Sequence, residues 1–228
     1  MKKSDIAFLF DTLQRMFPDS RTELVYETPF QLMVSVILSA QTTDKQVNKV
    51  TANLYNILRW PQDIITMWES AFTQAIKSIG LYTSKAKNIY KLCQIIYSKE
   101  YANQFKDTSK EVKNIYKKYG YRISDDIIQL QKLPWIGEKT AKVVAHVLYD
   151  IPVIAVDTHV HRVSNRLWLV ATTQPLQTSK LLEKEIPDAY KQIAHHTLIL
   201  FGRYHCMARK PKCETCPFIK FCMYYKQL

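Results

Sequence analysis

The stretch Leu133-Pro-Trp-Ile-Gly-Glu-Lys-Thr-Ala141 has the pattern of a helix that ends, a tight turn that contains Gly137, and a second helix that begins. The first N–H groups of a helix have no partner within it, and they lie at the positive end of the helix dipole. The stretch therefore predicts a helix-hairpin-helix, at about 127–146, whose turn can bind a DNA phosphate. An ordinary pair of antiparallel helices joined by Pro and Gly fits the same residues.

Outside this hairpin, the rest of the 228-residue chain is also helical in pattern. Its four glycines are too few for the repeated tight turns of a dinucleotide-binding fold, a P-loop enzyme or a β sandwich. Helical apolar spacing predicts helices over 5–17, 29–38, 44–57, 61–68, 72–79, 84–96, 138–148, 159–170, 178–186 and 189–201. Ser84 is the expected cap of the helix that ends at 96. Pro152 and Asp157 cut short the only strand candidate, Val153–Val156. We expect an all-α fold.

The charge of the chain points to nucleic acid. Its 32 Lys and Arg residues exceed its 20 Asp and Glu residues by 12, an imbalance typical of nucleic-acid-binding proteins. A lysine-rich solvated surface is the alternative explanation of this positive charge. Seven basic residues lie in 98–122, which we expect to be a solvated helical insertion. The chain has no run of about 18 apolar residues and no targeting segment, so we expect a cytoplasmic protein without a membrane partner.

Two charged residues follow the patterns of catalytic groups. Lys139 comes two residues after Gly137, where partial burial and the helix dipole would lower its pKa and supply an amine nucleophile; an ordinary surface lysine is the alternative. Asp157 ends an apolar run and begins a helix. It is a candidate catalytic carboxylate, and a simple helix N-cap is a sufficient alternative explanation.

The cysteines indicate a metal centre. Four of the five have the spacing Cys206-x6-Cys213-x2-Cys216-x5-Cys222, and Cys93 stands alone. Four thiolates hold either a structural zinc ion or an iron–sulfur cluster. Zinc ribbons pair two short Cys-x2-Cys knuckles, whereas this segment has one, so the pattern favours a [4Fe–4S] cluster.

Taken together, these motifs resemble the endonuclease III branch of the helix-hairpin-helix DNA glycosylase superfamily. The resemblance covers almost the entire chain. It rests on the hairpin, the Val156-Asp-Thr-His159 motif, the cysteine spacing, and the two segments Leu38-Ser-Ala-Gln-Thr-Thr-Asp44 and Ile79-Gly-Leu-Tyr-Thr-Ser-Lys-Ala86.

The resemblance implies two helical domains with the DNA site in the cleft between them. Residues 25–151 would form a six-helix barrel that contains the hairpin. Residues 1–24 and 152–228 would form the cluster domain, in which the four cysteines hold [4Fe–4S]. The partner would be double-stranded DNA with a damaged base or an abasic site, bound by a monomer that is associated with the nucleoid if the protein is bacterial.

The resemblance also implies roles for individual residues. Lys139 would attack C1′ of a damaged nucleotide and form a Schiff base, assisted by Asp157, and β-elimination would then cut the strand. Gln41 and Leu81 would fill the space left by the extruded base. Other DNA contacts would come from Trp135, Gly137, Thr140, Arg209, Lys210 and Lys212. The implied activity is that of a bifunctional glycosylase and abasic-site lyase acting on oxidised pyrimidines.

Three alternatives stay open at this point. One is a mismatch- or adenine-type monofunctional glycosylase, a branch that lacks a lysine at the position of Lys139. The others are a noncatalytic DNA-binding protein that retains the cluster and a zinc-stabilised adaptor. Trp135 also departs from the family, whose hairpin usually has glycine there, and it carries a cost if the position requires a positive φ.

Overall fold

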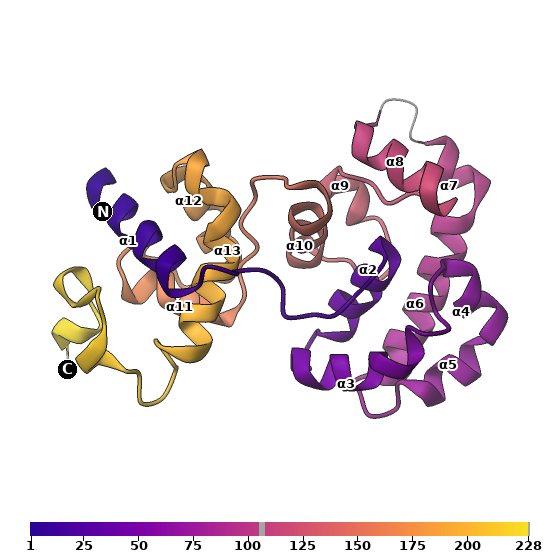
Figure 1. Cartoon of the computed structure of the whole chain (residues 1–228), viewed down its shortest axis with the longest axis horizontal. Coiled ribbons are helices and arrows are strands. Elements are labelled where there is room, and N and C mark those ends of the chain that lie inside the picture. The colour runs from indigo at the N-terminus through magenta and orange to yellow at the C-terminus, as the bar shows by residue number, and fades with distance from the viewer. Residues whose placement is uncertain (105–107, 228) are drawn as a thin grey trace. The chain divides into compact units, whose positions relative to one another are not determined.

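The computed structural model describes residues 1–104 and 108–227 (Figure 1), and within them it contains helices and no strand, which confirms the all-α prediction. Lys106, one of the seven basic residues of 98–122, lies outside the described residues. The α-helices are α1 (Lys3–Met16), α2 (Pro29–Leu38), α3 (Asp44–Leu54), α4 (Pro61–Met67), α5 (Glu69–Ala75), α6 (Tyr82–Tyr97), α7 (Lys99–Asn103), α8 (Lys110–Tyr119), α9 (Ile127–Leu130), α10 (Glu138–Tyr149), α11 (Thr158–Arg166), α12 (Pro175–Glu185) and α13 (Asp188–Tyr204). Short 3-10 helices follow at Cys213–Thr215, Ile219–Phe221 and Tyr225–Gln227.

The chain divides into two compact units. Unit 1 combines Met1–Thr22 with Asp150–Leu228, and unit 2 consists of Glu23–Tyr149. Unit 1 therefore contains α1 and α11–α13, whereas unit 2 contains α2–α10 (Figure 1). No helix of the described residues is long and apolar enough to cross a membrane.

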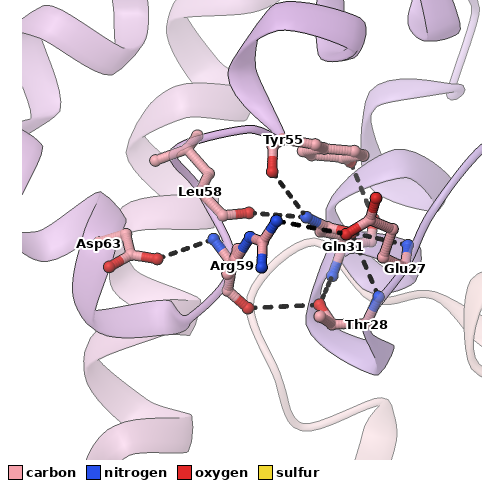
Figure 2. A network of polar contacts seen from close by, with 7 residues as sticks. All are labelled: Glu27, Thr28, Gln31, Tyr55, Leu58, Arg59 and Asp63. Atoms are coloured by element: carbon pink, nitrogen blue, oxygen red, sulfur yellow. Dashed lines mark hydrogen bonds and ion pairs between the residues drawn. The ribbon is translucent and has the colours of Figure 1, made fainter.

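Helix α2 lies at the centre of unit 2, as its all-round apolar sequence predicts. Every residue from Phe30 to Leu38 is buried. Its N-terminus is closed by a capping box, in which the Gln31 amide donates to Thr28 Oγ1 at 3.1 Å and the Thr28 amide donates to Gln31 Oε1 at 3.2 Å. Figure 2 shows that the Gln31 side chain also donates to the carbonyl oxygens of Tyr55 and Leu58, at 3.2 and 3.0 Å. A fully buried amide thus has partners on all sides, which joins α2 to the end of α3.

The described lysines of the segment 98–122 are exposed on or beside α7 and α8, as its charge predicts, but the segment also packs into the core. Tyr121 is only 2% exposed, and its hydroxyl accepts a hydrogen bond from the amide of Phe30 at 3.0 Å. This amide is one of the N–H groups that α2 itself cannot pair. The Tyr119 ring makes tilted contacts with the rings of Trp60 and Tyr121, with centroid distances of 5.5 and 5.9 Å. The segment therefore contributes both a cap and a buried aromatic residue to the core of unit 2.

Unit 1 is built on the close packing of α11 against α13. A Cβ added to Gly202 on α13 would lie 2.9 Å from His159 Cβ and 3.2 Å from Val163 Cγ2. Glycine is therefore required here by the approach of the two helices. Helix α1 completes this core with Leu9, Phe10 and Leu13, all fully buried. The N-terminal helix and the C-terminal third of the chain thus share one hydrophobic cluster.

The strand candidate Val153–Val156 is an extended segment without strand pairing in unit 1. Its backbone is held by side chains instead. The Ile154 amide donates to Glu183 Oε1 at 3.1 Å, and Ser179 Oγ donates to the Ile154 carbonyl at 2.7 Å. This segment leads directly into α11, and it therefore fixes the position of Asp157, the residue just before that helix.

Candidate catalytic and DNA-binding site

The predicted hairpin is formed by α9, a turn at 131–137, and α10. Asp126 caps α9 by accepting from the amides of Ile128 and Gln129. The first turn of α10 closes when the Ala141 amide donates to the Gly137 carbonyl at 2.9 Å. The N–H groups before Ala141 have no partner inside the helix, and they lie at its positive end. This end of α10 can bind an anion such as a DNA phosphate.

The left-handed residue of this turn is Trp135 and not Gly137. Trp135 has a φ of 60°, whereas Gly137 lies outside the left-handed region. A residue with a Cβ at such a φ costs about 1–2 kcal/mol. The position of Trp135 does require a positive φ, so the tryptophan carries the cost in free energy that was expected for this case. Gly137 is exposed, and an added Cβ would meet no protein atom within 4 Å. Nothing in the folded chain itself demands a glycine at 137.

Lys139 is the second residue of α10, and its side chain is exposed, so the partial burial expected for it is not found. It takes part in no hydrogen bond or ion pair with the described residues. The acidic residue beside it, Glu138, instead pairs with Lys142, with Nζ and Oε1 3.0 Å apart. Because Lys142 neutralises Glu138, the Lys139 amine remains available to a ligand.

Asp157 does cap α11, as the simpler explanation of this residue predicts. Its Oδ1 accepts from the amides of His159 and Val160 at 2.9 and 2.8 Å. Oδ2 accepts no hydrogen bond from the described residues, and the side chain is half-buried. One oxygen of the carboxylate is therefore structural, and the other is open to a reacting group. Asp157 belongs to unit 1 and Lys139 to unit 2.

The two residues expected to fill the space of an extruded base share one backbone conformation. Gln41 and Leu81 have φ values of 58° and 57°, both left-handed. The Gln41 side chain is exposed, and that of Leu81 is 54% exposed. Helix α6 begins at Tyr82 with Leu81 as its cap residue, three residues earlier than Ser84, which the sequence predicts as its cap. Two exposed side chains on strained backbone are typical of functional positions.

Sequence reasoning missed Lys85, which joins these two loops. Its side chain is 0% exposed, and its Nζ donates to the carbonyls of Leu38 and Ala40, at 2.9 and 2.6 Å. Burial lowers the pKa of this ammonium group. A signal for this position exists in the sequence, because Lys85 stands on the buried stripe of α6 in line with Ile89, Leu92 and Ile96. A charged residue on an apolar stripe indicates a buried partner.

The four clustered cysteines come from one loop after α13, and none of them forms a disulfide bond. Burial raises the pKa of Cys216 to about 11, with further contributions from the thiols of Cys222, Cys206 and Cys213. Burial likewise raises the pKa of Cys213, with contributions from Cys206 and Cys222. Thiolates gathered in this way repel one another unless a cation compensates them, so the donor set fits a metal group. Within the described residues, no three His, Cys, Asp or Glu side chains are grouped to hold a single metal ion.

Arg166, at the end of α11, holds the first part of the cysteine loop. Its guanidinium donates to Cys206 Sγ at 3.5 Å and to the carbonyls of Met207 and Ala208 at 2.8 and 3.2 Å. The guanidinium lies over the ring of Tyr224, 3.8 Å from its centroid. Arg209, Lys210 and Lys212, the predicted phosphate-binding residues of the loop, are all exposed. Lys210 has a φ of 51°, so the loop is strained where these charges project.

Comparison with known proteins agrees with these features. Residues 34–188 match the model of the HhH-GPD superfamily of base excision DNA repair proteins. Residues 206–222 match the iron-sulfur binding domain of endonuclease III, and the cofactor of the cysteine loop is a [4Fe–4S] cluster. The chain is 42% identical to endonuclease III of Bacillus subtilis over 95% of this chain and 91% of the relative. It is 36% identical to endonuclease III of Escherichia coli K12 over 100% and 99%.

Solved structures give the same result. A structure of a trapped endonuclease III–DNA covalent intermediate superimposes with a TM-score of 0.84 at 41% identity, covering 100% of this chain and 98% of that one. A thermostable thymine-DNA glycosylase superimposes with a TM-score of 0.80 at 22% identity, covering 99% and 98%, and this likeness shows the fold alone.

Proposed function

The chain belongs to the endonuclease III family of HhH-GPD base excision repair proteins, and we propose that it is a bifunctional DNA glycosylase and abasic-site lyase that removes oxidised pyrimidines from duplex DNA. Unit 2 serves as the helix-hairpin-helix domain and unit 1 as the iron–sulfur domain. In this proposal the enzyme works as a monomer in the cytoplasm, and it is associated with the nucleoid if the protein is bacterial.

The damaged nucleotide must first leave the base stack, because its C1′ is shielded inside the duplex. Gln41 and Leu81 enter the vacated space from two neighbouring loops, one with an amide that can pair with the opposite base and one with an apolar side chain. The hairpin holds the backbone of the same strand. The amides at the start of α10 and the Thr140 hydroxyl bind a phosphate beside Gly137.

The Lys139 amine then performs the substitution at the sugar. Its lone pair forms a bond to C1′, the N-glycosidic bond breaks, and the electron pair leaves with the base, which takes up a proton. Loss of the amine proton and opening of the sugar ring give an iminium linkage between Nζ and C1′. Removal of a proton from C2′ breaks the bond between C3′ and its oxygen, which cuts the strand. Water finally releases the lysine.

Asp157 stabilises the positive charge that develops on the sugar as the base departs. The open Oδ2 is the atom that can do this, because Oδ1 is occupied by the amides of His159 and Val160. The carboxylate also assists Lys139 in the reaction, which is the role that the family resemblance implies for it.

The four cysteines Cys206, Cys213, Cys216 and Cys222 hold the cluster. When bound, the cluster cross-links the loop rigidly and takes no part in breaking bonds of the DNA. The loop presents Arg209, Lys210 and Lys212 to phosphates outside the lesion. Arg166 keeps the first part of this loop in place through its bonds to Met207 and Ala208.

The observation that carries this proposal is the unpaired, exposed amine of Lys139 directly after the hairpin turn. Borohydride reduces an iminium to a stable amine, so it should trap the protein on duplex DNA that contains an oxidised thymine. Lys139→Gln should abolish trapping. Lys132→Gln, which removes another exposed lysine near the same turn, is the matched control and should trap normally. Base release without any trapping would instead establish a monofunctional glycosylase.

A further inference from the structure

Lys85 connects the loops that carry Gln41 and Leu81, through both its backbone and its side chain. Its backbone amide donates to the Leu81 carbonyl at 3.0 Å, which closes the first turn of α6. Its ammonium donates to the carbonyls of Leu38 and Ala40, and it lies 3.4 Å from Thr42 Oγ1. One residue therefore holds the backbone of both loops.

The ammonium is costly to bury, and its surroundings explain how it is tolerated. A charge removed from water loses several kcal/mol of solvation unless partners replace the water. Leu38 is the last residue of α2, so its carbonyl has no partner in that helix and lies at the negative end of the dipole. The ammonium satisfies this carbonyl and that of Ala40, in the middle of the turn that leads to Gln41.

The two loops also approach each other directly. A Cβ placed on Gly80 would lie 3.6 Å from both the Gln41 carbonyl and Thr42 Oγ1. Gln46 Nε2, on α3, donates to Ser78 Oγ at 3.1 Å beside the same junction. By contrast, the side chains of Gln41 and Leu81 are exposed and contribute little packing to hold their strained backbone. The positions of these side chains therefore depend on the backbone contacts that Lys85 supplies.

We propose that Lys85 is a positioning residue that couples the Gln41 and Leu81 loops into one unit, so that both side chains enter the DNA together when a base is extruded. This inference rests on the proposed function. Lys85 touches neither DNA nor the reacting atoms, and it acts by fixing the left-handed backbone at two positions that lie 40 residues apart in the sequence.

The first test uses the free protein with its cluster. Lys85→Met keeps the aliphatic stem and removes the three donors, and Lys91→Met, at an exposed position of the same helix, is its matched control. In Lys85→Met, hydrogen exchange at the backbone amides of residues 42 and 85 should become at least about tenfold faster than in the wild type, because local opening of the loops becomes easier. Exchange in α10 should not change. Unchanged exchange in both loops would overturn the proposal.

The second test measures base release in single turnovers. Lys85→Met should lower the rate on an oxidised thymine paired with adenine by about 10- to 100-fold, the loss expected when positioning groups shift by about 1 Å. On a duplex with no base opposite the lesion, Gln41 and Leu81 have little base stacking to replace, so Lys85→Met should lower the rate much less. An equal loss on both duplexes would show a general structural role and overturn the proposal.

A double-mutant cycle separates coupling from simple destabilisation. If Lys85 acts through the loops, Lys85→Met should lower the rate of base release far less in the Leu81→Ala variant than in the wild-type chain. Rate losses that simply add, as free energies, would contradict the coupling. Should Lys85→Met fold poorly, Lys85→Arg retains a donor and should recover part of the rate on the paired duplex. If the wild type released no base at all, the proposed function would fail, whereas hydrogen exchange would still decide whether Lys85 couples the loops.

Discussion

Asp157 Oδ1 accepts a hydrogen bond from the amide of Val160 at 2.8 Å, so the candidate catalytic carboxylate is also the N-cap of α11. The structural and the catalytic interpretations of this residue are therefore compatible. They make different demands on the side chain, since capping needs an oxygen and catalysis needs a negative charge.

Asp157→Asn should separate the two roles. Asparagine caps helices as well as aspartate does, so the free energy of unfolding should change little. The rate of base release should fall by about 100-fold or more, as expected when a preorganised electrostatic group is removed. Asp157→Ala should lose both functions and unfold about 1 kcal/mol more easily. Thermal unfolding and single-turnover kinetics of the two variants check this, and full activity of Asp157→Asn would contradict the catalytic role.

Gly137→Ala tests whether the glycine of the hairpin serves DNA. An added Cβ would touch no protein atom within 4 Å. Alanine is a poorer helix N-cap than glycine, but it lowers the conformational entropy of the unfolded chain. Because these effects oppose each other, the free energy of unfolding should change by less than about 1 kcal/mol. A phosphate held against the backbone would meet the new methyl group. Duplex affinity should therefore fall at least about tenfold, or about 1.4 kcal/mol. Unchanged affinity at constant salt would show that no phosphate approaches Gly137.

Trp135→Gly and Trp135→Ala isolate the cost of the tryptophan. Both remove the indole, but only glycine adopts a φ of 60° without strain. The glycine variant should therefore be more stable than the alanine variant by about 1 kcal/mol in chemical denaturation. If the indole crowds the DNA, both variants should bind duplex more tightly, and to a similar extent. Equal stability of the two would contradict backbone strain at this position.

The exposed lysines of 98–122 should contribute to the salt dependence of DNA binding. Lys99, Lys110, Lys113 and Lys117 are exposed, whereas Lys118 is better left in place because it lies over the Tyr119 ring. Replacing these four by Glu should reduce the slope of log affinity against log salt by about 0.9 for each phosphate that the protein no longer neutralises. The buried Val112 and Tyr121 are untouched, so folding should be retained. A slope equal to that of the wild type would exclude phosphate binding by this segment.

Arg166→Lys should loosen the cluster without removing a charge. Lysine cannot reproduce the planar fork that reaches Cys206, Met207 and Ala208 while stacking on Tyr224. The visible absorbance of the cluster should decay several times faster in a chelator. Arg15→Lys is the matched control, because Arg15 lies in the same unit and its guanidinium donates to Thr12 of its own helix. Equal decay of all three proteins would contradict a role for Arg166 in holding the loop.

Much of the helical fold is predictable from local pattern. The central position of α2 follows from a helix that is apolar on every face, and Pro29 marks its first residue. For α6 the sequence predicts a cap three residues too late, because Ser84 is a good cap by composition. The structure instead uses Leu81 in a left-handed conformation, which composition does not favour.

By itself, the sequence determined the helical class, the hairpin, the spacing of the four cysteines, and the identity of Lys139 and Asp157 as candidates. These features depend on residues close together in the chain, where turn chemistry and ligand spacing are local. Only the tertiary structure decided that Tyr121 caps α2 from 91 residues away, that Lys85 is buried between two loops, and that the left-handed residue of the hairpin is Trp135. Such contacts arise when helices pack, and the free energy that holds a buried charge or a strained φ comes from neighbours that no local pattern specifies.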